Sequence, residues 1–197
     1  EQTISIHFVD NYMLHGVPNT AFTEALAFIF QSRDLQLLDM KNNDPLAHEY
    51  ENLEIAWSLY EIMGVSLVDM NVWKWMYENP DATPKELKEQ VIVIAKDVWN
   101  KYYAPVFGIK DQTILAVYSH MIDAPLYLSA YPLGHLIQFQ LEQHLKGKDF
   151  ASEVTRIYSL GRLTPDAWMV QATGSKLSAE PLLKAAAESV KVVNATK

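Results

Sequence analysis

The residues of this sequence that could do chemistry are its histidines and carboxylates, because the chain has no cysteine and imidazole is a common acid–base group and metal ligand. Residues 48–52 (HEYEN) begin like the zinc motif HExxH, but Asn52 stands at the position of the second histidine. Two zinc ligands on one helical face require histidines at i and i+4, so this segment is not that motif. We interpret as ordinary surface or core residues the histidines that have no partner at ligand spacing, which are His7, His15, His135 and His144.

Other self-contained catalytic motifs are missing from the sequence. Gly147 and Lys148 lack the preceding glycine and the following hydroxyl residue of a phosphate-binding loop. The Gly-x-Ser-x-Gly elbow of serine hydrolases is not present either. Short motifs therefore leave the function open.

A longer segment, residues 16–25 (GVPNTAFTEA), resembles the gluzincin zinc oligopeptidases, the group that includes angiotensin-converting enzyme and thimet oligopeptidase. In that group a similar Phe-x-Glu-Ala stretch opens the helix whose glutamate is the third zinc ligand, and the resemblance places Glu24 at that glutamate. Phe28 stands where angiotensin-converting enzyme has an aspartate near its zinc site. Without the resemblance, Glu24 would be interpreted as a solvated carboxylate on a helix face.

A second segment, residues 120–131 (HMIDAPLYLSAY), is similar to the stretch of these peptidases in which a histidine precedes two tyrosines that face the substrate. The resemblance implies that Tyr131 donates a hydrogen bond to the oxyanion, while His120 and Tyr127 hold the substrate backbone, with His120 also counted among the catalytic residues. A phenol suits the first role because negative charge develops on the carbonyl oxygen. Four residues separate the tyrosines, so on a helix they would share one face; without the resemblance both could be core residues.

The resemblance implies that the full-length protein, called the parent below, is a zinc-dependent oligopeptidase that hydrolyses short peptides. In the family the HExxH helix precedes the third ligand, and we expect it upstream of Glu1, in an N-terminal part of the same protein. Catalytic zinc sites have three protein ligands and a water. We therefore expect the 197 residues alone to be inactive, to bind no Zn²⁺, and to self-associate through apolar surface that the N-terminal part would cover.

Two other interpretations remain open. The chain could be a non-catalytic helical interaction or scaffold module, in which Glu24 and the tyrosines are packing residues. It could also be a degenerate peptidase that has become a binding protein. The codons upstream of Glu1 separate the three, since an intact HExxH favours the peptidase, a corrupted one the degenerate form, and none the module.

Net charge and hydropathy indicate which classes of binding partner are unfavourable for this chain. The formal net charge of −8 makes a phosphate backbone an unfavourable partner, so we expect no nucleic acid. No apolar run approaches the roughly 20 residues of a membrane-spanning helix. The sequence gives no indication of the compartment.

The elements that must position these residues are helices. Thr83, Pro84 and Glu86 form a helix start with a capping box, and the apolar positions that follow at helical spacing are Leu87, Val91, Ile94, Val98 and Tyr102. A second apolar face is formed by Leu133, Ile137, Leu141 and Leu145, and residues 20–38 also have a helical pattern. We therefore expect an all-α fold in which residues 1–197 form a single helical unit, the C-terminal part of a peptidase catalytic domain.

Overall fold

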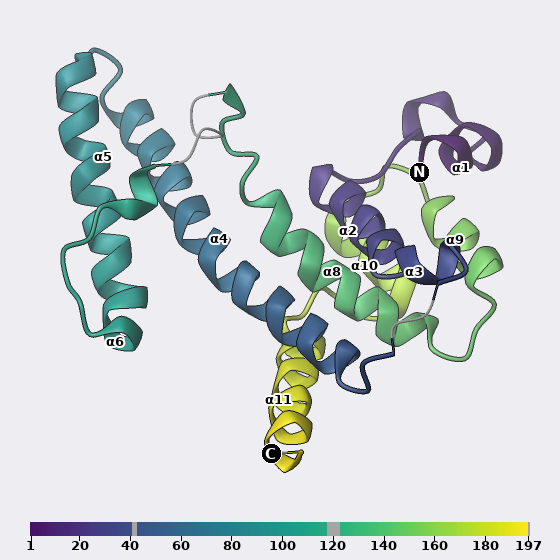
Figure 1. Ribbon diagram of the computed structural model, residues 1–197. Helices are drawn as coiled ribbons and strands as arrows, with labels where there is room; N and C mark the ends of the chain where they lie inside the picture. Colours follow the sequence, from purple (N-terminus) through teal and green to yellow (C-terminus); the bar gives the residue numbers. More distant parts are fainter. Residues whose placement is uncertain (41–42, 118–122, 197) are drawn as a thin grey trace. The chain divides into compact units, whose positions relative to one another are not determined.

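The computed structural model describes residues 1–40, 43–117 and 123–196 (Figure 1). Within these ranges the secondary structure is helical and contains no strand, which confirms the all-α fold. Backbone contacts divide the chain into two compact units: unit 1 comprises Glu1–Trp57 and Leu133–Lys197, and unit 2 comprises Ser58–Pro132. That the two units belong to one catalytic domain stays a prediction.

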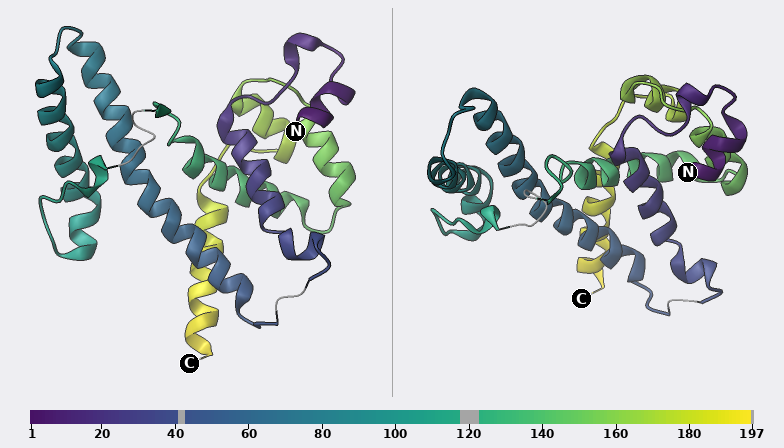
Figure 2. Two further views of the ribbon diagram at one scale, coloured as in Figure 1. Left: turned by 45° about the horizontal axis from the view of Figure 1, so that its top comes forward. Right: turned by 90° about the horizontal axis from the view of Figure 1, so that it is seen from above.

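Unit 1 contains helices from both ends of the chain. They are α1 (Gln2–Phe8), the 3₁₀ turn η1 (Tyr12–Leu14), α2 (Thr20–Gln31), α3 (Asp34–Leu37), the start of α4 (Ala47–Glu78), most of α8 (Ala130–Leu145), α9 (Phe150–Tyr158), α10 (Pro165–Thr173) and α11 (Glu180–Ala195). Helix α1 packs against α9 (Figure 2). Over the described residues, no helix combines the length and the apolar character needed to cross a membrane.

Helix α2 carries much of the core of unit 1. It begins where the Asn19 side chain accepts a hydrogen bond from the Ala21 N–H at 3.0 Å, as an N-cap should. The Phe22 ring meets the Trp168 ring edge to face, and the buried Tyr158 hydroxyl donates to the Phe22 carbonyl oxygen at 3.1 Å. The continuous helix expected over residues 20–38 is wrong at one point, because α2 ends at Gln31 and α3 begins at Asp34.

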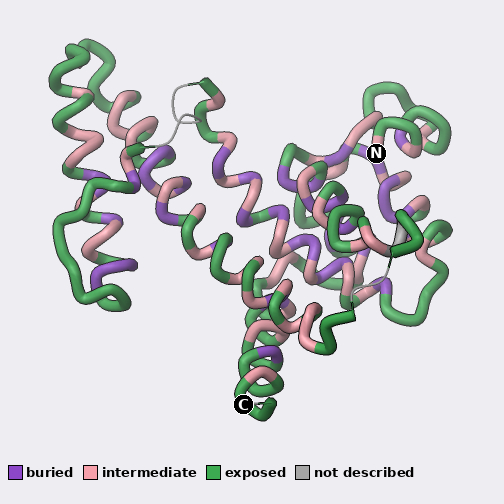
Figure 3. The backbone as a smooth tube through the Cα atoms, in the orientation of Figure 1, coloured by how far each residue is buried: buried purple, intermediate pink, exposed green. Residues whose placement is uncertain are grey.

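The predicted apolar face of α8 is buried along most of its length (Figure 3). Ile137, Leu141 and Leu145 are buried, whereas Leu133 is 40 % exposed. The helix ends at Leu145, close to Gly147 as predicted. One side of α8 is thus fixed in the core of unit 1.

Unit 2 contains the rest of α4, α5 (Pro84–Val98), a π-helical turn (Trp99–Tyr103), α6 (Ala104–Phe107) and η3 (Ile114–Ala116). Helices α4 and α5 run side by side there (Figure 1). The predicted start of α5 is confirmed, because Thr83 and Glu86 form both bonds of the capping box. The core residues that these elements bury together are Val68, Ile94, Ala95, Val98, Tyr103 and Leu115.

The π turn corrects the predicted apolar face of α5. A four-residue step from Val98 leads to Tyr102, yet Tyr102 is 43 % exposed and Tyr103 is buried. In the π turn the Ala104 N–H bonds to the Trp99 carbonyl oxygen, five residues back, so the buried position moves on by one residue. The Tyr103 hydroxyl then reaches α4 and donates to the Tyr60 carbonyl oxygen at 2.5 Å.

Candidate functional site

Glu24, the predicted metal ligand, lies on α2 where this helix comes close to Gly134 of α8. A methyl group at Gly134 would lie 2.9 Å from the Glu24 Cβ, 3.0 Å from the Phe28 ring and 3.2 Å from the Ala21 carbonyl oxygen. A glycine at residue 134 therefore permits the close contact of the two helices. The Glu24 side chain is neither fully buried nor fully exposed, as a carboxylate that serves a site should be.

His135 follows Gly134 and contributes an imidazole to the same region. Its ring stacks on Phe28 with centroids 3.8 Å apart and planes 7° apart, and its Nδ1 lies 2.9 Å from the Gln138 Oε1. Burial lowers the pKa of His135, although the hydrogen bond to Gln138 and the charge of Glu24 act in the opposite direction. A neutral imidazole thus lies within electrostatic range of the Glu24 carboxylate. The sequence contains no signal for this pair, because the two residues come from different helices.

Phe28 supports the residues around His135. Its ring packs flat on the imidazole of His135, and its carbonyl oxygen accepts a hydrogen bond from the Gln138 side chain at 3.3 Å. Phe28 thus holds the neighbouring imidazole by stacking.

The described residues do not by themselves form a complete zinc site. No three His, Asp or Glu side chains within them are grouped closely enough to hold a metal ion. Glu24 and His135 offer at most two donors, one fewer than the three protein ligands of a catalytic zinc. A zinc site that uses Glu24 would need ligands from outside the described part of the chain.

The predicted tyrosine pair is in contact, but not in the predicted way. The rings of Tyr127 and Tyr131 meet edge to face with centroids 5.4 Å apart. Helix α8 begins at Ala130, so Tyr131 is helical while Tyr127 precedes the helix, and the placement of both on one helical face is wrong. A turn closed by the Ala130 N–H and the Tyr127 carbonyl oxygen at 2.8 Å brings the rings together instead.

The remaining expectations about the site stay predictions. His120 lies outside the described residues. Glu24 belongs to unit 1, whereas Tyr127 and Tyr131 belong to unit 2, and their convergence on one zinc site is not tested.

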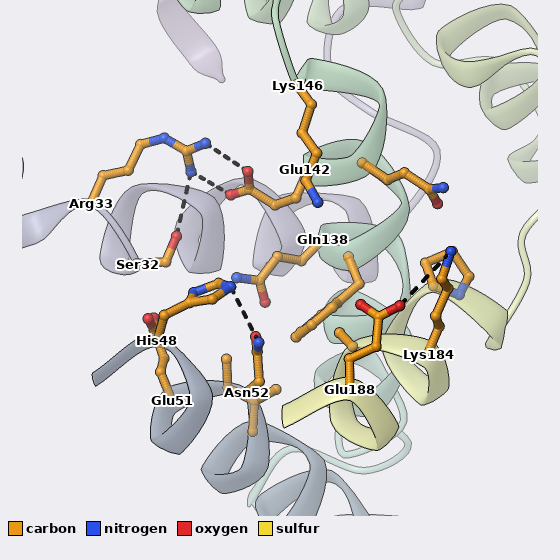
Figure 4. A pocket seen from close by; sticks show the side chains of 15 residues that line it. Ser32, Arg33, His48, Glu51, Asn52, Gln138, Glu142, Lys146, Lys184 and Glu188 are labelled. Carbon is orange, nitrogen blue, oxygen red and sulfur yellow. Dashed lines mark hydrogen bonds and ion pairs between the residues drawn. The ribbon is translucent and has the colours of Figure 1, made fainter. Parts of the chain in front are cut away.

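Unit 1 also contains a cavity of about 410 Å³ that does not include Glu24 (Figure 4). It lies among the end of α2, the start of α4, α8 and α11. Arg33 and Glu142 point toward each other in the cavity wall and form a two-pronged ion pair. The further charged residues that line it are Glu51, Lys146, Lys184 and Glu188. Cationic and anionic groups thus balance, which suits a small polar ligand that carries both charges.

Residues 48–52, which do not form an HExxH zinc motif, contribute one wall of this cavity. His48, Glu51 and Asn52 line it, and Asn52 donates hydrogen bonds toward His48 at 3.3 Å and to the buried Ser189 hydroxyl on α11 at 3.1 Å. Burial raises the pKa of Glu51, assisted by the charges of neighbouring acids and opposed by His48. The i, i+3, i+4 spacing of polar groups was the signal that could have predicted a shared helical face.

Comparison of the chain with protein-family models, with curated proteins and with solved structures finds no match. Any function must therefore be argued from the residues described above. The residues with the more specific predicted chemistry are Glu24 in unit 1 and the pair Tyr127 and Tyr131 in unit 2.

Proposed function

We propose that this chain is the C-terminal helical part of a zinc-dependent oligopeptidase that hydrolyses short peptides. The observation that carries the proposal is the edge-to-face contact of Tyr127 and Tyr131 at the start of α8. Two phenols in contact at a helix start can present two hydrogen-bond donors to one peptide backbone. The position of Glu24 beside a neutral imidazole agrees with a metal-ligand role.

In this proposal the chain's own residues bind and orient the substrate. Tyr131 donates a hydrogen bond to the carbonyl oxygen of the bond that breaks, where negative charge develops in the transition state. Tyr127 and His120 hold the backbone of the peptide, which lowers the entropic cost of reaction. Glu24 would contribute one of three protein ligands to Zn²⁺, and the N-terminal part of the parent would contribute the others.

The decisive experiment compares two polypeptides. The first is the 197-residue chain, and the second is the natural reading frame extended upstream of Glu1. Zinc content after dialysis and hydrolysis of a quenched-fluorescent peptide are measured for both. We expect one zinc and activity in the extended protein, and neither in the chain alone. An extended protein that has no HExxH and cleaves no peptide would contradict the proposal.

The second candidate is a non-catalytic helical interaction module, and the balanced charges of the cavity favour it. Such a module would use the cavity around Arg33 and Glu142 to bind a ligand. Glu142→Gln should then weaken binding in a screen of zwitterionic amino acids and dipeptides. A variant that binds every compound as the wild type does would exclude this use of the cavity.

A further inference from the structure

Asp69 is an unusual residue for the interior of unit 2. It lies on α4 next to the core residue Val68, and it is 1 % exposed. One carboxylate oxygen, Oδ1, is buried without a hydrogen-bond partner among the described residues. Burial raises the pKa of this carboxyl group, while a single backbone hydrogen bond acts in the opposite direction. Burying such a group is costly, so its position calls for a reason other than packing.

The one partner of Asp69 in the described chain lies in the turn that precedes the tyrosine pair. The Leu126 N–H donates to the Asp69 Oδ2 at 2.8 Å. Leu126 has a φ of 63°, in the left-handed region that residues other than glycine rarely adopt. The bond from Asp69 therefore stabilises a backbone conformation that leucine disfavours.

The turn is anchored on both sides of Tyr127. Leu126 is bound by Asp69, and Leu128 is 0 % exposed. The Tyr127 N–H also donates to the Ala124 carbonyl oxygen at 3.1 Å. With the backbone fixed at both neighbours, the Tyr127 ring is directed toward Tyr131, which it meets edge to face.

We infer that Asp69 is a positioning residue, which acts through Leu126 to hold the turn that brings Tyr127 against Tyr131. Its use in catalysis rests on the proposed function, in which these tyrosines bind the substrate. Asp69 itself touches neither the substrate nor the metal.

The first test uses the 197-residue chain and does not depend on any activity. Hydrogen exchange of the Leu126 amide and the nuclear Overhauser effects between the Tyr127 and Tyr131 rings are measured by NMR. Asp69→Ala removes the acceptor, so we expect exchange about 10- to 100-fold faster and weaker contacts between the rings. Asp69→Asn keeps a side-chain oxygen and should retain most of the protection.

Asp97→Ala is the matched control, because Asp97 lies in α5 of the same unit and is exposed. It should change neither reading. If Asp69→Ala does not fold, the test depends on Asp69→Asn. A folded Asp69→Asn variant in which the Leu126 amide is no longer protected from hydrogen exchange would overturn the role of the acceptor oxygen. Unchanged exchange and ring contacts in Asp69→Ala would overturn the inference as well.

The second test measures peptide hydrolysis by the parent. Asp69→Ala should lower kcat about tenfold or more, because a misplaced donor weakens the transition state, and Asp69→Asn should restore most of the rate. A wild-type parent without peptidase activity would contradict the proposed function. The hydrogen-exchange measurements would still test the role of Asp69 in that case. An active parent whose kcat is unchanged by Asp69→Ala would remove the catalytic role of the turn.

Discussion

Each unit contains a glycine inside a helix that lets a neighbouring side chain approach closely, and the two neighbouring side chains differ in their role. In unit 2 a methyl group at Gly64 would lie 2.2 Å from the Tyr103 hydroxyl, and in unit 1 a methyl group at Gly134 would lie 2.9 Å from the Glu24 Cβ. The first glycine admits a core tyrosine, whereas the second admits a predicted metal ligand. Close packing around the glycine thus concerns stability in unit 2, and both stability and the predicted site in unit 1.

The largest effects on activity are expected from substitutions of the predicted site residues. In the parent, Glu24→Gln should release the zinc and abolish hydrolysis, because the carboxylate is a predicted ligand.

Tyr131→Phe should keep the zinc and lower kcat by about 10²–10³, or about 3–4 kcal/mol, since its hydrogen bond acts chiefly on the transition state. Tyr127→Phe should mainly raise KM. The measurements are steady-state kinetics on a quenched-fluorescent peptide and the zinc content of each variant.

Each outcome of that comparison is informative. If Tyr131→Phe keeps the wild-type kcat while Tyr127→Phe loses it, the roles of the two tyrosines are exchanged. If neither substitution matters, both are packing residues.

Gly64→Ala should have the largest effect on stability. The added methyl group overlaps the Tyr103 ring, which is buried and bound to the Tyr60 carbonyl oxygen. We expect the free energy of unfolding to fall by about 3 kcal/mol, as measured by urea denaturation. Tyr103→Phe removes the closest atom, so Gly64→Ala should cost less in that background. An equal cost in both backgrounds would show that the hydroxyl does not set the contact.

Gly134→Ala should have a smaller effect on stability and a larger one on the site. The methyl group would press on Glu24 and Phe28, and alanine's better helix propensity, about 1 kcal/mol, offsets part of the cost. We expect a net loss of about 1–2 kcal/mol in urea denaturation, together with weaker zinc binding in the parent. Leu133→Ala, one residue earlier and 40 % exposed in the wild type, is the control and should leave zinc binding unchanged. Normal zinc binding in Gly134→Ala would contradict the prediction that Glu24 is a metal ligand.

The smallest expected effect is a pH dependence from His135. Burial lowers the pKa of this residue in the folded chain, whereas the unfolded chain takes up a proton near the ordinary value of about 6.5. The unfolded state therefore binds more protons below that pH, and the free energy of unfolding should fall as the pH decreases through about 6.5.

Urea denaturation of His135→Gln and of the exposed His7→Gln at pH 7.5 and 5.5 checks this prediction. The first variant should lose part of the wild-type pH dependence and the second should keep it. Equal pH dependence in all three proteins would show that the folded chain does not hold His135 neutral.

Helix type and helix ends could be predicted where the signal is local. The capping box of Thr83 and Glu86 fixes the start of α5 with side chains three residues apart, so the sequence contains the whole interaction. The break between α2 and α3 lies at Ser32 and Arg33, and Arg33 there bonds to Glu142 from a distant part of the chain. A pattern confined to residues 20–38 cannot contain that partner.

The candidate site was less accessible to sequence reasoning for the same reason. The spacing of Tyr127 and Tyr131 correctly predicts that they lie together, but the turn that joins them depends on Leu126 and its bond to Asp69. The close approach of Glu24 to α8 depends on Gly134, which has no side chain to prevent it. Both interactions join residues far apart in the chain, which periodicity cannot detect.

The π turn between α5 and α6 limits how the length of this chain could change during evolution. It contains one more residue per turn than an α-helix, and it places Tyr103 against Gly64. Deleting one residue from Trp99–Tyr103 would restore a regular helix, but it would rotate the preceding and following side chains about 100° relative to each other. Homologous chains that keep this core should therefore tolerate substitutions in the turn more readily than a change in its length.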